Sequence, residues 1–577
     1  MKPFAHAVFA ALLLSPASPF LAGPARAAAE DVVFKALEDE LKRSLTLHLE
    51  DLDKPYFIQY GVDDGVTYRL SAEYGALTRS DRNQTRVLHS QVRVGSYDLD
   101  NSNFAGARGG GRLGGVTELP SDDNYLALRQ AIWHATDHQF KDAVETLSQK
   151  RAYLKERNAE ERAPDFTRAA PATAVAELAT LRFESTVWED YVRRISARFR
   201  DFPRIDGAEV LLLAGAENHY LVNSEGARLR HGEVEVLLRI TVEAQADDGE
   251  HLSDQLSYFA TAPEKLPPVA EILTAVQRLA DRLAAASRAP ILQEYSGPVL
   301  FDGQAATQLF RQLLVRGVTG QPDPVGGARR NTAGADDAEN RIGKRLLPQT
   351  FTIYDDPRAP KFEDTFLAGH YRHDDEGVEA QRVNLVVQGK LEGMVMSRAP
   401  TKQFAASNGH SRRGGGELPR SSIGCLYVES SKGMTPEALK QELLRATEAE
   451  GLKFGLRIEG IQSRSSGPGG GPGTFGRGAV RGSPRLVGDP IYVSKVFPDG
   501  HEELVRGCEF SALDVQSLRR IIAAGSARAV QNNVIGNTPS SSVIAPAILI
   551  AEVELARNKG EVEKRPLLAA PHARRAP

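Results

Sequence analysis

The chain has 577 residues, of which 41% are hydrophobic and 25% are charged, and its formal net charge at pH 7 is −4. A chain of this length has room for about two to four domains, each with its own core. The charge balance provides no basic stripe, so we expect no nucleic-acid partner. No apolar run is long enough to predict a membrane span.

The N-terminus has the layout of a cleavable signal peptide over residues 1–29. Lys2 precedes a short apolar run at 5–14, and small residues follow as far as Ala29. This order of charge, apolar core and A-x-A sequence is typical of secretory signals. We expect cleavage after Ala27 or Ala29 and an exported protein, periplasmic or extracellular. A mildly apolar N-terminal helix is the alternative.

Two cysteines, Cys425 and Cys508, are present in the whole chain. In an exported protein they could form a bridge. One possible bridge is not a scaffold for a chain of this size, so two buried, unreactive thiols are the favoured interpretation.

Residues 30–165 carry both helical and strand patterns. The expected elements are, in chain order, a charged helix over 31–52, strands at 56–60, 67–70 and 87–94, a glycine-rich loop at 106–115 and a long helix over 125–150. Apolar residues recur along the long helix at three- and four-residue steps, and Asp/Gly turns separate the strands. This mixture predicts an α+β domain.

A linker rich in alanine, proline and charge, 156–174, leads into a second unit at 175–290. The expected elements of that unit are a helix over 188–201, strands at 208–213, 219–222 and 234–244, and an amphipathic helix over 267–289. Alternating apolar residues indicate the strands, and helical spacing indicates the closing helix.

The third domain is expected over 292–558. Its expected elements are a strand, turn and helix over 298–317, a hairpin of 383–387 with 391–396, a helix from Pro436 to Glu450 capped by Thr435, and a helix capped by Ser511 that ends before Gly525. A low-complexity insertion at 465–484 is expected to be flexible. The tail at 559–577 is charged and rich in proline and alanine, which predicts disorder.

The segment from His373 to Arg413 has an ordered pattern of charged, glycine and small residues, HDDEGVEAQRVNLVVQGKLEGMVMSRAPTKQFAASNGHSRR. It resembles the C-terminal signature of the TldD/PmbA family, predicted zinc-dependent metallopeptidases of the type also named modulators of DNA gyrase. Gln91–Phe104 and Ala127–Ala143 are similar to the secreted branch of this family. The implied fold class is α+β: N-terminal and central α/β segments followed by a mainly antiparallel β C-terminal domain.

The resemblance implies a zinc ion held by two histidines of an HExxxH helix and by a cysteine near the C-terminus. Here LFRQLLVRG places Arg311, Gln312 and Arg316 at the His, Glu and His positions, and the cysteine position falls at or next to Asn532. An arginine has no lone pair for Zn²⁺, and a glutamine cannot act as a general base. No cofactor is therefore expected, although the family typically uses zinc. Apolar residues at 313–315 predict a regular packed helix, since positions five apart lie about 140° apart.

Several charged residues are candidates for binding a peptide, because arginine forks suit carboxylates. They are Arg311, Arg316, Asp375, Glu376, Arg382, Arg398 and His410. The alternative for the two helix arginines is an ordinary polar helix face. A relocated metal site at His370 and His373, beside three carboxylates, is the alternative to a chain without metal.

The resemblance therefore favours a metal-less subunit or pseudopeptidase in peptide proteolysis. In this family a subunit type with the metal motif pairs with one that lacks it around a chamber for unfolded peptides. We expect a peptide or unfolded polypeptide as ligand, and either a homodimer or a heterodimer with an HExxxH-containing paralogue. The alternatives are an active peptidase with a relocated metal site and a non-enzymatic peptide-binding protein of the envelope.

Overall fold

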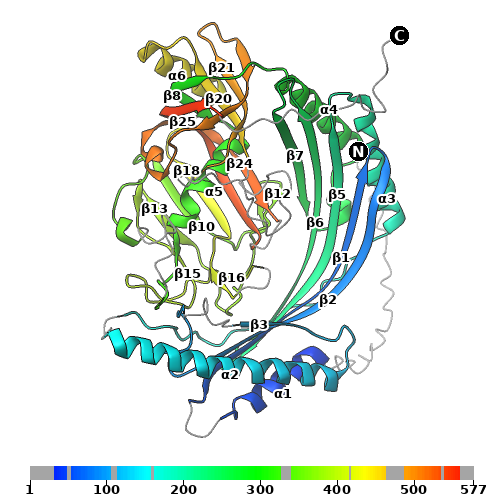
Figure 1. The fold of residues 1–577 in the computed structure, drawn as a ribbon, viewed down its shortest axis with the longest axis vertical. Helices are drawn as coiled ribbons and strands as arrows, with labels where there is room; N and C mark the ends of the chain where they lie inside the picture. Colours follow the sequence, from blue (N-terminus) through cyan, green and yellow to red (C-terminus); the bar gives the residue numbers. More distant parts are fainter. Residues whose placement is uncertain are drawn as a thin grey trace, which may run out of the picture.

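The structure is a computed structural model that describes residues 31–48, 53–105, 114–157, 162–326, 339–414, 418–462, 487–534 and 539–558. The expected signal peptide, the 465–484 insertion and the 559–577 tail lie outside these residues. Two large sheets organise the described chain, one of seven strands and one of twelve. The seven-stranded sheet is long and curved, and the C-terminal domain lies on its concave side (Figure 1).

The N-terminal sheet joins the two segments that the sequence predicted as separate domains. Its elements are α1 Val32–Ser44, β1 Pro55–Glu73, β2 Ala76–Val94, β3 Gly114–Glu118, α2 Tyr125–Arg157, β4 Thr173–Val175, α3 Ser185–Ala197, β5 Gly207–Asn223, β6 Arg228–Gln245, β7 His251–Ala260 and α4 Val269–Ala286. The strand order is β3-β2-β1-β5-β6-β4, with β7 also paired to β6. Because β1 pairs with β5 from Gln59 to Ala72, the expected boundary at 165–175 does not divide this sheet.

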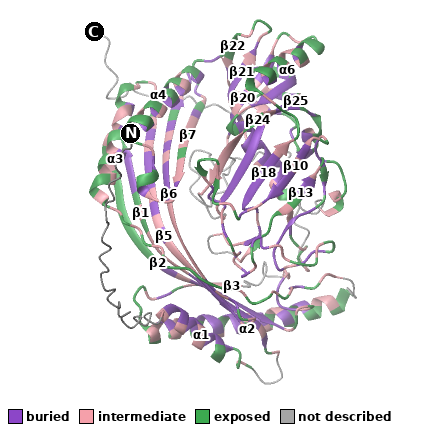
Figure 2. Ribbon diagram, turned by 180° about the vertical axis from the view of Figure 1, so that it is seen from behind, coloured by how far each residue is buried: buried purple, intermediate pink, exposed green. Residues whose placement is uncertain are grey.

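The two faces of this sheet differ because successive side chains of a strand point to opposite sides. Even-numbered residues of β1 pack under the helices, with Ile58 in the core beneath α1 and α2 and Leu70 in the core beneath α3 and α4. Figure 2 shows these two buried zones at the two ends of the long strands. Odd-numbered residues such as Gln59 and Asp63 point to the C-terminal domain, where they bond to Asp375 and Arg413.

The C-terminal domain surrounds one large core under a mixed sheet of order β14-β13-β10-β18-β25-β8-β20-β21-β22. Its elements are β8 Glu294–Phe301, α5 Gln304–Leu314, β9 Thr319–Gly320, β10 Phe351–Asp355, β11 Lys361–Phe362, β12 Thr365–Phe366, β13 Val383–Val387, β14 Lys390–Leu391, β15 Val395–Met396, β16 Ser411–Arg412, β17 Arg420–Ser421, β18 Cys425–Ser430, β19 Gly433–Met434, α6 Pro436–Ala449, β20 Gly455–Ile461, β21 Pro490–Val496, β22 Glu502–Val505, β23 Cys508–Phe510, β24 Ile521–Asn533 and β25 Ser541–Arg557. Most pairs are antiparallel, as expected, and β18–β25 and β20–β8 are parallel.

Helix α6 confirms its predicted cap, since the Thr435 side chain accepts a hydrogen bond from the amide of Ala438. The helix expected after Ser511 is wrong. Asp514 instead caps a 3-10 turn, Val515–Arg520, and β24 starts directly after it. The expected second strand of the 383–396 hairpin is also shorter, because β14 ends early and β15 pairs with β9.

Cys425 and Cys508 are both buried and free, which confirms the prediction of two unpaired thiols. Burial raises the pKa of Cys425 well above its ordinary value and that of Cys508 to about 12. Within the described residues, no helix is both long and apolar enough to cross a membrane.

Candidate functional site

Helix α5 carries the residues at the predicted metal-motif positions. It follows β8 through a turn at Asp302-Gly303 and lies against β20, β24 and β25. The predicted apolar face is confirmed, because its members are all buried: Ala306, Leu309, Phe310, Leu313 and Leu314. Because this face is buried, only the side chains on the rest of α5 remain accessible for chemistry.

The last turn of the predicted helix differs from expectation. The α-helix ends at Leu314, and Val315–Gly317 forms a 3-10 turn. A β-branched residue and a glycine both have low helix propensity, and 3-10 turns are frequent at helix ends. Arg316 is therefore exposed on this turn, while Arg311 is half-buried on the α-helix. The two arginines do not have the same surroundings.

Arg311 is the more enclosed of the two cations. Burial lowers the pKa of its guanidinium from the ordinary value. In the described part of the chain, no hydrogen bond or ion pair joins it to another residue. Burial alone accounts for the lowered pKa, with no contribution from a carboxylate. A guanidinium offers five donors in a planar fork that suits a carboxylate. Arg311 is thus available for a ligand of that chemistry.

Gln312, at the position of the family's general base, binds backbone on both sides of the 463–486 segment. Its Oε1 accepts a hydrogen bond of 2.8 Å from the amide of Gly488. Its Nε2 donates a longer bond, 3.4 Å, to the carbonyl of Gln462. One side chain that both donates and accepts must be an amide here, because a carboxylate has no donor. Gln312 is a structural link between β20 and the start of β21.

We expect Gln312→Glu to destabilise the protein by about 1–3 kcal/mol, because the carbonyl of Gln462 loses its donor and faces a negative charge. The shift of the urea midpoint at pH 7 measures this effect. Gln308→Glu is the matched control on the same helix. Gln308 only accepts, from the amide of Ile461 at 2.6 Å, and a carboxylate keeps that bond. Equal losses in the two variants would contradict the role assigned to Gln312.

Asn532, at the expected cysteine position, is also committed to structure. Its Oδ1 accepts from the amide of Ala368 at 3.0 Å and from the hydroxyl of Ser542 at 2.6 Å. Its Nδ2 donates to the carbonyl of Phe366 at 2.8 Å. The side chain joins the 366–368 segment to β24 and β25, and it supplies no thiolate.

The residues at these positions do not fit a zinc ion. Zinc sites use thiolate, imidazole or carboxylate donors. The guanidinium groups of Arg311 and Arg316 have hydrogen-bond donors but no lone pair for a metal. The side-chain amides of Gln312 and Asn532 are already hydrogen-bonded to backbone. Two fixed positive charges would also repel a cation. Zinc chemistry at α5 is therefore incompatible with these side chains.

The carboxylates and the histidine proposed for peptide binding are engaged within the protein. Asp375 accepts from the amide of Arg413 at 2.6 Å, and Glu376 accepts from the amide of Arg398 at 2.8 Å. His410 is fully buried, with its Nε2 3.0 Å from Oδ1 of Asp355. These side chains hold loops of the signature together.

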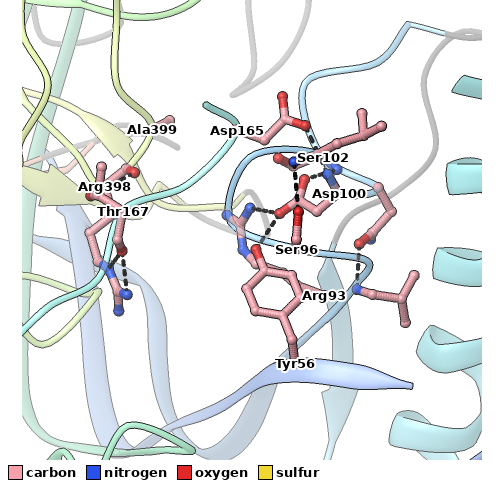
Figure 3. Close-up of polar contacts among 12 residues, drawn as sticks. Tyr56, Arg93, Ser96, Asp100, Ser102, Asp165, Thr167, Arg398 and Ala399 are labelled. Carbon is pink, nitrogen blue, oxygen red and sulfur yellow. Dashed lines mark hydrogen bonds and ion pairs between the residues drawn. The ribbon is translucent and has the colours of Figure 1, made fainter. Parts of the chain in front are cut away.

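Arg398 is fully buried between the N-terminal sheet and the signature segment (Figure 3). Its Nε and Nη2 donate to the carbonyl of Thr167 at 2.9 and 2.5 Å. Its Nη2 also lies 2.7 Å from Oε2 of Glu225, an ionic contact outside hydrogen-bond geometry. Arg398 is therefore a joint between domains. Arg382, another peptide-binding candidate, is exposed and stacks 3.6 Å from the ring of Tyr354.

The segment 91–104 also supports a buried polar network. Asp100 accepts from the hydroxyl of Tyr56 at 2.7 Å and from Nη1 of Arg93 at 2.8 Å. Its amide donates to Asp165 at 2.9 Å, as Figure 3 shows. Burial opposes ionisation, but Arg93 and the hydrogen bonds hold the pKa of Asp100 below its ordinary value. The residues that make this segment resemble the family thus have a role in stabilising the fold.

The relocated metal site at His370 and His373 has no convergent geometry. Nδ1 of His370 lies 2.7 Å from the carbonyl of Pro357, and burial lowers the pKa of His373. Among the residues that the structure describes, one group brings three ligand atoms within 4.8 Å of one another: Asp63, Glu217 and His219. The sequence analysis did not identify this group.

The new group lies on the concave face of the N-terminal sheet, where odd-numbered residues of neighbouring strands meet. His219 is directly opposite Asp63 across β1 and β5, and Glu217 is opposite Glu233 across β5 and β6. Nδ1 of His219 lies 2.8 Å from Asp63, and its Nε2 lies 3.1 Å from Glu233. The alternating patterns Glu217-Asn-His219 and His231-Gly-Glu233-Val-Glu235 are the sequence signal that could have located it.

Burial and close charged neighbours separate the pKa values of this group. Burial would lower the pKa of His219, but hydrogen bonds to Asp63 and Glu233 outweigh it and hold the pKa well above its ordinary value. Burial opposes ionisation of Glu233 too, yet His219 lowers its pKa to about 2. Burial and the neighbouring Glu233 raise the pKa of Glu235 to about 8. Such divergence is frequent at functional sites.

A cavity of about 170 Å³ adjoins this group between the two sheets. Glu217, Glu233 and Glu235 line it together with Leu237 of β6, and Val534 at the end of β24 closes it. It combines three carboxylates with an apolar wall. Within the described residues, this is a second place, distinct from α5, where a ligand can be held.

Sequence and structure comparisons agree with the signature. Residues 294–463 match the family described as the PmbA/TldA metallopeptidase C-terminal domain. An Archaeoglobus fulgidus protein named a metalloprotease is 28% identical over 108 residues, 19% of this chain. That match spans only 24% of the relative's own length.

Two solved structures share the fold over most of the chain. TldE from Thermococcus kodakarensis has a TM-score of 0.59 at 14% identity, with 90% of this chain and 100% of that chain covered. A candidate modulator of DNA gyrase from Thermotoga maritima has a TM-score of 0.56 at 13% identity, with 87% and 96% covered. At these identities the likeness concerns the fold.

A curved sheet that faces a mixed-sheet domain, with α5 at the place of a metal motif, defines a protein of metallopeptidase-like fold. Residues 294–463 match the model of the PmbA/TldA metallopeptidase C-terminal domain, and the fold of the described chain is similar to that of TldE. The family resemblance and the α+β fold class predicted from the sequence are thereby confirmed.

Proposed function

We propose that this chain is an exported, polypeptide-binding member of the TldD/PmbA type that lacks the family's zinc centre and acts in proteolysis beside a catalytic partner. One observation carries the proposal. The motif positions of α5 hold Arg311, Gln312 and Arg316, and the amide of Gln312 is bonded to backbone on both sides. The helix of a peptidase is thus retained with side chains that cannot perform its chemistry.

Arg311 supports a binding role for α5. It is half-buried, its pKa is lowered by desolvation, and no carboxylate pairs with it in the described residues. A carboxylate from a polypeptide, either an acidic side chain or a C-terminus, would satisfy the guanidinium fork. The signal-like N-terminus supports export, and the family's division into metal-bearing and metal-less subunits supports a partner with an intact HExxxH.

We expect the purified protein to bind an unfolded, fluorescently labelled casein peptide with a free C-terminus and to leave it uncut. Arg311→Gln should weaken binding about tenfold or more, since a hydrogen-bonded charge contributes ~1.5–3 kcal/mol. Arg316→Gln is the control, because its exposed charge is screened by water and salt. Fluorescence anisotropy measures affinity, and mass spectrometry detects cleavage.

Chelator-sensitive cleavage that is lost in Gln312→Ala would overturn the proposal, because it would place an active metal on α5. Equal affinity for wild type and Arg311→Gln would remove α5 from peptide binding. The partner is tested by gel filtration of the protein mixed with a purified HExxxH-containing paralogue. A homodimer that excludes the paralogue would replace the catalytic pair with a stand-alone binding protein.

A further inference from the structure

We propose a second site that does not depend on the function of α5: a divalent transition-metal ion of the zinc type, held on the concave face of the N-terminal sheet by His219, Glu217 and Glu233. The ligands come from β5 and β6, two neighbouring strands of a continuous sheet. Strands fix side-chain positions more closely than loops do. The site lies apart from the motif positions on α5.

The spacing of the ligand atoms fits one small ion. Nε2 of His219 lies 3.1 Å from Oε1 of Glu233 and 3.7 Å from Oε2 of Glu217. A tetrahedral zinc with bonds of about 2.0–2.1 Å separates neighbouring ligand atoms by roughly 3.3 Å. The two observed distances from Nε2 lie on either side of that value. Each carboxylate is therefore near the distance from Nε2 that a shared ion requires.

The other ring nitrogen of His219 is already oriented as in metal sites. A ligating histidine usually donates its second N–H to a carboxylate, which fixes the ring and its tautomer. Here Nδ1 lies 2.8 Å from Oδ1 of Asp63. Asp63 is in turn held by Nη2 of Arg413 at 2.8 Å and by Nε2 of His89 at 2.9 Å. This outer layer makes Nε2 the ligand atom, and a metal ion there would replace its 3.1 Å hydrogen bond to Oε1 of Glu233.

The charges around the site favour a cation. Glu217, Glu233 and Glu235 converge on it, while the charge of Arg413 is balanced by Asp63. Among the nearby arginines, Arg412 lies 3.6 Å from Asp375, which offsets it. Glu235 has no hydrogen bond or ion pair to another described residue. A divalent ion would relieve the repulsion between the Glu217 and Glu233 carboxylates.

The identity of the ion follows from the donors. An imidazole among carboxylates suits zinc and similar first-row metals, whereas an all-oxygen set would suit magnesium or calcium. With three protein ligands, a fourth position would remain open, and the cavity of about 170 Å³ adjoins the group. The side chain of Glu217 is half-exposed, which gives the ion a route from solvent. A site of this form holds a water or a ligand group at its open position.

The test is titration of the chelator-treated full-length protein with ZnCl₂ alone, by calorimetry at pH 8, followed by metal analysis. We expect one zinc per chain. Glu217→Gln and His219→Gln should each weaken binding by more than the roughly 10- to 100-fold that loss of an outer partner causes. Asp63→Asn should fall within that 10- to 100-fold range. Glu217 has no hydrogen bond of its own in the described residues, so its variant keeps the fold.

His251→Gln is the matched control, because His251 lies on the same sheet and contacts Glu243 at 3.3 Å without a third ligand. It should bind zinc as wild type does. No binding, or binding unchanged in Glu217→Gln, would overturn the metal site. Zinc lost in Gln312→Ala and retained in His219→Gln would overturn it too, and would also contradict the proposed function. Zinc lost only in the sheet variants leaves the proposed function intact.

Discussion

Lys150→Met should lower the free energy of unfolding of the N-terminal sheet by about 3–5 kcal/mol, because it removes the fully buried cation of Asp165 and leaves that carboxylate with the partly exposed Arg162 alone. Lys150 and Asp165 have no exposed side-chain surface, and Nζ lies 2.6 Å from Oδ2. Nζ also donates to the carbonyl of Ser102 at 2.6 Å. Desolvation lowers the pKa of Lys150 and raises that of Asp165, so each charge depends on the other.

Both tryptophans of the chain, Trp133 on α2 and Trp188 on α3, belong to the N-terminal part, so their fluorescence in urea reports this transition. Lys141→Met is the control on the same helix. Its partner is Asp137 in an exposed pair, and such pairs contribute only about 0.3–0.5 kcal/mol. Adding Asp165→Asn to Lys150→Met should recover part of the loss. No recovery would contradict the assignment of the loss to the buried Asp165 charge.

The sequence predicted what local patterns encode. The buried face of α5, the cap of α6 and the two free thiols follow from spacing and composition over short stretches. The signature at 373–413 identified the family, because its order of residues is preserved within one segment. The helix expected after Ser511 failed for a related reason: pairing of β24 with the distant β25 overrode a weak helical pattern.

The sequence could not show that the two N-terminal segments share one sheet, because β1 pairs with β5 across more than a hundred intervening residues. The same limit applies to the peptide-binding candidates, whose partners within the protein could not be read from the sequence. Charged residues such as Glu376 and His410 are usually exposed, and their burial becomes acceptable only through partners elsewhere in the chain. The group around His219 was missed because its ligands are local on each strand but meet only through the register of three strands.

Arg398→Met should destabilise both domains together, by about 3–5 kcal/mol, because one side chain contacts three segments of the N-terminal part. Its guanidinium bonds to the carbonyl of Thr167, pairs with Glu225 and lies 4.9 Å from the ring centroid of Phe57 on β1. The change removes the donors of a buried carbonyl and the cation opposite a carboxylate. Arg398→Lys keeps the charge but not the fork, so it should recover only part of the loss.

Two probes distinguish a side chain that stabilises both domains from one that stabilises its own domain alone. Tryptophan fluorescence follows the N-terminal sheet, and reaction of Cys425 and Cys508 with a thiol reagent follows the C-terminal domain, where both are buried. Arg398→Met should shift both urea transitions, whereas Arg382→Met, an exposed stacking arginine of the same signature, should shift neither by more than about 1 kcal/mol. A shift confined to thiol exposure would restrict Arg398 to its own domain. A shared shift would mean that Arg398, and with it the signature segment, holds the two sheets face to face.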